Sequence, residues 1–150
     1  MNTQNAHTQQ GRLYVFEGPD GVGKTTLARA FAKEIADTRP SEQYSYPGND
    51  PGTLGHLVYK LHHDARSLGV NNISPSSLQL LHVAAHIDLL SKLVVPALRS
   101  GRTVVLDRFW WSTWVYGRAS SVSEAALTAM LCLEEIYLAG IVPDVVFLVD

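Results

Sequence analysis

The chain of 150 residues is poor in cysteine and charge, and it lacks a long unbroken hydrophobic run. Its single cysteine, Cys132, excludes an intrachain disulfide framework and is typical of a protein from the reducing cytoplasm. Charged residues make up only 17% and the formal net charge is −2, so no general surface for nucleic acid or anionic lipid is expected. No apolar run is expected to cross a bilayer.

Enough hydrophobic sequence is present for one core. Hydrophobic residues make up 46% of the chain, and the length predicts a single domain over residues 12–150. The polar segment 1–11 has neither the cationic start nor the apolar centre of a signal peptide. We expect that segment to be a disordered lead-in.

Strand and helix patterns alternate along the domain. Strands are predicted at 12–17, 43–46, 103–107 and 145–149, and helices at 24–37, 53–63, 74–100 and 123–139. Ser74 and Pro75 begin the longest helix, and Pro96 predicts a kink one turn before its end. The strands are short and apolar, and the last one has the composition of a buried strand. This pattern predicts a mostly parallel sheet covered on both faces, a three-layer α/β/α sandwich.

The segment Gly18-Pro19-Asp20-Gly21-Val22-Gly23-Lys24-Thr25 fits the pattern G-x-x-x-x-G-K-[ST] between a strand and a helix. Glycines let successive backbone N–H groups converge on phosphate oxygens, and the helix start adds its positive dipole end. Lys24 is expected to reach the β- and γ-phosphates, and the Thr25 hydroxyl to ligate Mg²⁺. The segment predicts binding of a nucleoside triphosphate.

A carboxylate ends the strand at 103–107. In proteins with such a phosphate loop, an acid at this place holds Mg²⁺, often through water. Asp107 and Asp150 both fit this role. Asp107 is favoured because Arg108 follows it, and a guanidinium beside the metal carboxylate suits a site for two phosphate-bearing substrates.

Together these segments resemble the thymidylate kinases. The run from Phe16 to Thr26 is similar to that family's phosphate loop, and Asp107-Arg108-Phe109 with Ser112, Thr113 and Tyr116 is similar to its Asp-Arg-aromatic segment. Pro143-Asp144 before a hydrophobic strand that ends in Asp is a further similarity. The resemblance implies a P-loop NTPase fold with a lid, the cofactors ATP and Mg²⁺, a nucleotide acceptor, a cytoplasmic location and a homodimer.

The resemblance also implies individual roles. The donor phosphates would lie against Gly18, Asp20, Gly21, Val22, Gly23, Lys24, Thr25 and Thr26. The catalytic residues would be Lys24, Asp107 and Arg108, with Thr25 and Asp107 at the metal. The acceptor would contact Asp20, Tyr46, His82, His86, Arg108, Ser112 and Tyr116.

Three departures from the family pattern leave the acceptor open. Ser45 stands where the family has an arginine for the acceptor phosphate, and His82 and His86 replace a base-stacking aromatic and a base-reading arginine. Three tryptophans, at 110, 111 and 114, cluster beside this region. A metal held by His82 and His86 at i and i+4 is disfavoured, because no third ligand is evident.

Three functions therefore remain. The first is ATP-dependent phosphorylation of a thymidylate-like nucleoside monophosphate. The second is a deoxynucleoside kinase-like reaction on an acceptor without phosphate, which suits Ser45, and the third is a nucleotide-binding module without kinase activity. The resemblance also calls for an arginine-rich lid and a final strand after Asp150, so the chain looks like the N-terminal part of a kinase.

Overall fold

The computed structural model describes residues 11–150, and its centre is one parallel sheet of four strands. The strands are β1 (Leu13–Glu17), β2 (Ser41–Ser45), β3 (Thr103–Asp107) and β4 (Val145–Leu148), in the order β2-β3-β1-β4. In the ladder between β1 and β3, Phe16 lies opposite Asp107. The phosphate loop after β1 and the Asp-Arg segment after β3 therefore leave the same edge of the sheet side by side.

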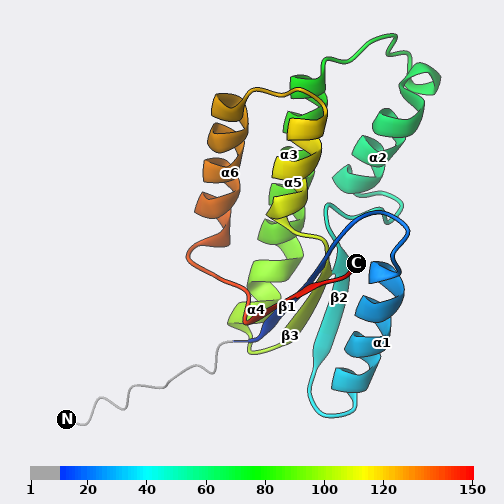
Figure 1. Ribbon diagram of the computed structural model, residues 1–150. Coiled ribbons are helices and arrows are strands. Elements are labelled where there is room, and N and C mark those ends of the chain that lie inside the picture. Colours follow the sequence, from blue (N-terminus) through cyan, green and yellow to red (C-terminus); the bar gives the residue numbers. More distant parts are fainter. Residues whose placement is uncertain (1–10) are drawn as a thin grey trace.

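Helices connect the strands (Figure 1). They are α1 (Lys24–Ala36), α2 (Leu54–Asp64), α3 (Pro75–Leu89), α4 (Val95–Arg99), α5 (Trp110–Ala119) and α6 (Glu124–Leu138). A 3₁₀ turn, η1 (Ala65–Leu68), follows α2, and a π-helical turn, η2 (Leu90–Val94), joins α3 to α4. Each predicted helix is present, and α5 is an additional one.

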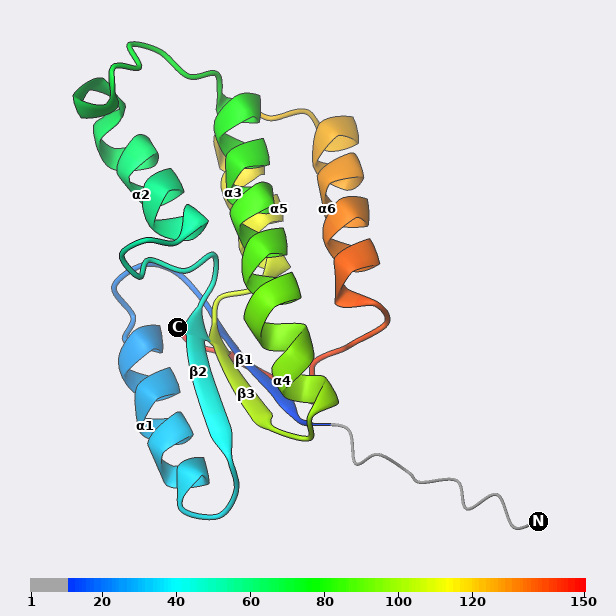
Figure 2. The ribbon, with the colours of Figure 1, turned by 180° about the vertical axis from the view of Figure 1, so that it is seen from behind.

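Alternate side chains of the central strands serve different faces of the sheet. Leu13 and Val15 of β1, with Val104 and Leu106 of β3, pack against η2 and α4. Phe16 and the intervening residues Tyr14 and Val105 pack on the opposite face with Ala28, Phe31 and Ala32 of α1. Figure 2 shows the long helix through α3 and α4 lying across the face away from α1. The predicted three-layer α/β/α arrangement is confirmed.

The long helix begins and bends where the sequence indicates. The Ser74 hydroxyl accepts a hydrogen bond from Ser77 N, and Pro75 takes the first helical position. A π-helical turn, η2, lies directly before the segment that contains Pro96, the residue at which a kink is predicted. A π turn changes the hydrogen-bond spacing, so the helix continues past a residue that has no N–H to donate.

The long helix is apolar along much of its length. The continuous segment Pro75–Arg99 is long and apolar enough to cross a membrane by length and composition. Such a test is weak evidence for a membrane span, since core helices of soluble proteins also pass it. Here the helix packs against α2, α5, α6 and β3, and it carries the buried polar residues Gln79 and His86.

Helices α2, α3, α5 and α6 extend beyond the carboxyl ends of the strands (Figure 1). A separate hydrophobic cluster lies among these helices, away from the two faces of the sheet. It consists of Val83 of α3, Leu127 and Met130 of α6, and Val122. These helices therefore lie next to the carboxyl ends of the strands, on the side of the sheet where the phosphate loop follows β1.

Two further expectations differ from the structure. The strand at 145–149 is not buried: β4 lies at the edge of the sheet, and Leu148 is 79% exposed. Gly11, assigned to the disordered lead-in, donates a hydrogen bond to Leu98 O at 2.8 Å, whereas residues 1–10 lie outside the described residues.

Candidate active site

The phosphate loop runs from Gly18 to Gly23 between β1 and α1. Gly18 has φ 146°, and a Cβ there would lie 2.0 Å from Val149 O, so only glycine fits beneath β4. Gly23 has φ 91° and is the N-cap of α1, where no side chain caps the helix. Left uncapped, the first N–H groups of α1 are available to an anion.

Lys24, Thr25 and Asp107 come together at this loop. The Lys24 ammonium donates to Pro19 O, and burial together with the nearby Arg108 lowers the pKa of Lys24. The Thr25 hydroxyl donates to Asp107 Oδ2 at 2.5 Å. The contact joins the two residues predicted to share the metal, and it is Asp107 rather than Asp150 that reaches Thr25.

The donor set at Thr25 and Asp107 fits Mg²⁺. Asp107 is buried, and among the described residues its Oδ1 atom has no hydrogen-bond partner. A buried carboxylate oxygen without a partner is costly unless a cation or water satisfies it. Carboxylate and hydroxyl oxygens beside a phosphate cradle are the ligands that Mg²⁺ takes in such sites.

A cavity of about 330 Å³ opens between the two segments. Its lining consists of Asp20, Gly21, Gly23, Lys24, Thr25, Asp107 and Arg108. Both predicted metal residues and five of the predicted donor residues thus share one cavity with the arginine predicted to contact the acceptor. The other predicted donor residues, Gly18, Val22 and Thr26, do not line it.

Arg108 lies at the entrance to this cavity, in contact with three predicted acceptor residues. Its guanidinium forms an ion pair with Asp20 and donates to Ser112 Oγ at 3.2 Å. The Tyr116 ring lies 5.2 Å from the guanidinium carbon, and its hydroxyl donates to Asp20 at 2.8 Å. That hydrogen bond and the charge of Arg108 lower the pKa of Asp20. An anionic acceptor would meet a guanidinium already held in position from several sides.

The predicted acceptor residues Tyr46 and His86 lie deeper. Both are buried, and their rings stack with centroids 3.9 Å apart. His86 Nδ1 lies 2.6 Å from Glu134 Oε1, while the Tyr46 hydroxyl donates to Glu134 Oε2 at 3.2 Å and Thr113 Oγ1 donates to Oε1 at 3.1 Å. Burial and the neighbouring Glu134 carboxylate raise the pKa of Tyr46 well above its usual value. His86 and Tyr46 thus belong to a buried polar cluster.

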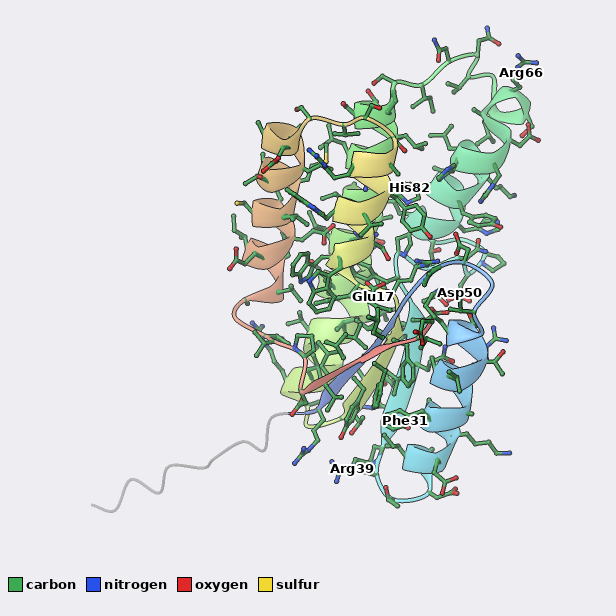
Figure 3. The ribbon with its side chains drawn as sticks, viewed as in Figure 1. Glu17, Phe31, Arg39, Asp50, Arg66 and His82 are labelled. Atoms are coloured by element: carbon green, nitrogen blue, oxygen red, sulfur yellow. The ribbon has the colours of Figure 1, made fainter. Side chains whose placement is uncertain are left out.

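His82 lies one turn from His86, nearer to α2. Its Nε2 atom is 3.0 Å from Nδ1 of His62, which joins α3 to α2. Burial lowers the pKa of His82 to about 4, with smaller contributions from His86, His62 and His63. Figure 3 labels this side chain between α3 and α2. No group of three or more metal-ligating His, Cys, Asp or Glu residues occurs among residues 11–150.

Comparison with known proteins gives one consistent answer. The family model for thymidylate kinase matches residues 16–150. The chain is 39% identical over 148 residues to a thymidylate kinase from Dinoroseobacter shibae, covering 95% of this chain and 66% of that protein. It is 36% identical over 138 residues to a thymidylate kinase from Chlamydia trachomatis, covering 91% and 64%.

The chain belongs to the thymidylate kinase family. The resemblance carried by the phosphate loop and the Asp-Arg segment is thereby confirmed. A crystal structure of thymidylate kinase from Ehrlichia chaffeensis shares the fold, with a TM-score of 0.73 at 23% identity, over 94% of this chain and 75% of that one. The chain spans slightly less than two thirds of the length of the curated thymidylate kinases that it matches.

In this thymidylate kinase-like chain, two buried carboxylates near the site carry no role predicted from sequence. Glu17 accepts hydrogen bonds from Phe109 N at 2.7 Å and from Ser112 Oγ at 3.0 Å. Glu134 is the acceptor shared by Tyr46, His86 and Thr113. A signal for Glu17 is present, because an acid at the end of an apolar strand requires polar partners when it is buried. Glu134 gives no such signal, since an adjacent Glu135 makes that stretch of helix look exposed.

Proposed function

We propose that the protein transfers the γ-phosphoryl group of Mg-ATP to a nucleoside monophosphate, with dTMP as the acceptor. An oxygen of the acceptor phosphate forms a bond to the γ-phosphorus, and the bond from that phosphorus to the β,γ-bridging oxygen breaks. The products are ADP and the nucleoside diphosphate. Such transfer needs mainly alignment and neutralisation of charge from the protein.

The residues divide this work. The loop N–H groups and Lys24 bind the donor phosphates, and Thr25 and Asp107 would hold Mg²⁺, which supplies positive charge at the β- and γ-oxygens when bound. Arg108 orients the acceptor phosphate, while Asp20, Ser112 and Tyr116 border the acceptor nucleoside.

One observation carries the proposal: the donor loop and Arg108 line a single cavity at neighbouring strand ends. Family membership supports the same reaction, since the relatives named above are thymidylate kinases. We further propose a cytoplasmic enzyme that acts on small nucleotides, and a homodimer that light scattering would detect.

An acceptor panel tests the reaction. Purified protein is incubated with Mg-ATP and either dTMP, other nucleoside monophosphates, or thymidine, and ADP is measured. ADP formation that requires dTMP supports the proposal, and Lys24→Ala should abolish it. Transfer to thymidine but not to dTMP would favour the deoxynucleoside kinase-like reaction, which Ser45 suits because serine supplies no charge for an acceptor phosphate. ATP binding without acceptor-dependent ADP would indicate a nucleotide-binding module.

A further inference from the structure

Glu17 is a buried carboxylate at the last position of β1, directly before the phosphate loop. Figure 3 labels it at the carboxyl end of the sheet, below the helices that stand over that edge. Burial raises the pKa of Glu17, and the hydrogen bonds from Phe109 and Ser112 act in the opposite direction. An acid kept in such a place has to be balanced by its partners.

Both partners of Glu17 are neighbours of Arg108. One is the next residue in the chain, and the other accepts a hydrogen bond from the Arg108 guanidinium. Oε1 accepts from the backbone N–H of Phe109, the next residue along the chain. Oε2 accepts from the Ser112 hydroxyl, and the oxygen of that hydroxyl accepts from the Arg108 guanidinium. Two consecutive hydrogen bonds therefore connect the Arg108 guanidinium through the Ser112 hydroxyl to the Glu17 carboxylate.

The backbone of Arg108 needs support. Its φ is 75°, in the left-handed region that costs a residue with a side chain about 1–2 kcal/mol. Arg108 N donates to Phe16 O at 2.9 Å, and the N–H of Phe109 is the next one along the chain. Bonds from these two N–H groups to the end of β1 fix the turn, so the turn geometry depends on the strand that leads into the phosphate loop.

We infer that Glu17 is a positioning residue for Arg108, acting alongside the ion pair with Asp20: it holds the left-handed turn through Phe109 and the guanidinium through Ser112. Glu17 itself does not line the cavity of the phosphate loop. The inference rests on the proposed function, because Arg108 is taken to bind the acceptor phosphate. The inference adds that a residue of β1, the strand that leads into the phosphate loop, helps to align the acceptor.

Three variants separate the two hydrogen bonds. Glu17→Ala removes both acceptor oxygens. Glu17→Gln keeps one oxygen for Phe109 N but places an amide that donates, rather than accepts, at Ser112. Ser112→Ala leaves both Glu17 oxygens in place and removes the hydroxyl that joins them to the guanidinium, together with any contact of that hydroxyl to the acceptor. Glu42→Gln is the matched control, since Glu42 pairs with Arg102 on β2, away from the cavity.

Steady-state kinetics with varied dTMP and varied ATP give the main readout. We expect Glu17→Ala to lower kcat/KM for dTMP by about 100-fold and Ser112→Ala by about tenfold, while the KM for ATP changes by less than about threefold. Glu17→Gln should lie between them, and Glu42→Gln should match the wild type. The double variant Glu17→Ala/Ser112→Ala should be no worse than Glu17→Ala, because both act through Arg108. Equal loss for both substrates, or additive effects, would overturn the inference.

A structural readout keeps this inference separate from the proposed reaction. If the wild type transfers no phosphate to any acceptor, the proposed function fails, yet crystal structures of Glu17→Gln and Ser112→Ala still test Glu17. We expect the guanidinium of Arg108 to leave position 112 in both. An Arg108 side chain and turn that stay as in the wild type would show that Glu17 is only structural. These two variants also serve if Glu17→Ala does not fold.

Discussion

The buried cluster around Glu134 allows a quantitative prediction about stability. Glu134 is 1% exposed and accepts hydrogen bonds from Tyr46 and Thr113, with His86 Nδ1 at 2.6 Å. Glu134→Ala would remove the shared acceptor and leave these groups without it inside the protein. We expect this change to destabilise the fold strongly.

The magnitude follows from the partners. Each buried polar group left without a hydrogen bond costs about 1–3 kcal/mol, and Tyr46, His86 and Thr113 all lose their shared partner here. Because the freed groups relax together, we expect about 3–5 kcal/mol in total for Glu134→Ala. Glu134→Gln keeps one acceptor oxygen and should cost about 1–2 kcal/mol. Glu135→Ala, at the exposed neighbouring position, should stay within about 0.5 kcal/mol.

Urea denaturation followed by tryptophan fluorescence measures these differences. A double-mutant cycle with Tyr46→Phe adds a sharper test: removing the hydroxyl should cost about 1 kcal/mol in the wild type and almost nothing in Glu134→Ala. A loss of stability below about 1 kcal/mol for Glu134→Ala, or additive effects of the two changes, would show that Glu134 is not the stabilising partner of the Tyr46 hydroxyl.

Three other outcomes are expected. Arg108→Ala should raise the KM for the acceptor and lower kcat together, and an effect confined to ATP in steady-state kinetics would contradict its acceptor role. His82 is held neutral in the fold with a pKa of about 4, while the unfolded chain binds its proton near pH 6.5. The contribution of neutral His82 to stability is therefore present above pH 6.5 and is lost as the pH falls towards 4. His82→Gln should make the melting temperature less dependent on pH across this window, and an unchanged dependence would contradict this role of His82. Leu148→Lys, on the exposed edge strand β4, should reduce concentration-dependent self-association measured by light scattering. Equal association of the variant and the wild type would show that β4 does not mediate it.

The sequence predicts well where the glycine-rich loop and Asp107 lie in the fold. The glycines of the loop and the apolar strands before it and before Asp107 have strong local signals. Parallel strands end at the same side of a sheet, so the two loops lie side by side because β1 and β3 are also neighbours in the structure. The contact between Thr25 and Asp107 follows from this arrangement.

Other features depend on packing that local patterns do not contain. Helix α5 begins Trp110-Trp111-Ser112-Thr113-Trp114, a run of aromatic and β-branched residues with low helix propensity, and no side chain caps its start. It is helical because it packs between α3 and α6. The partners of Glu134 lie 21 to 88 residues away in the chain. Likewise, composition identifies β4 as a strand but does not reveal its place in the strand order or the exposure of Leu148.

Arg108 carries a consequence for how this protein evolves. Glycine would adopt the left-handed backbone at position 108 without the steric cost, so the backbone conformation by itself favours glycine there. Selection for binding an acceptor phosphate favours keeping the arginine. At this one position, the conformation of the backbone and the proposed contact with an acceptor phosphate favour different residues.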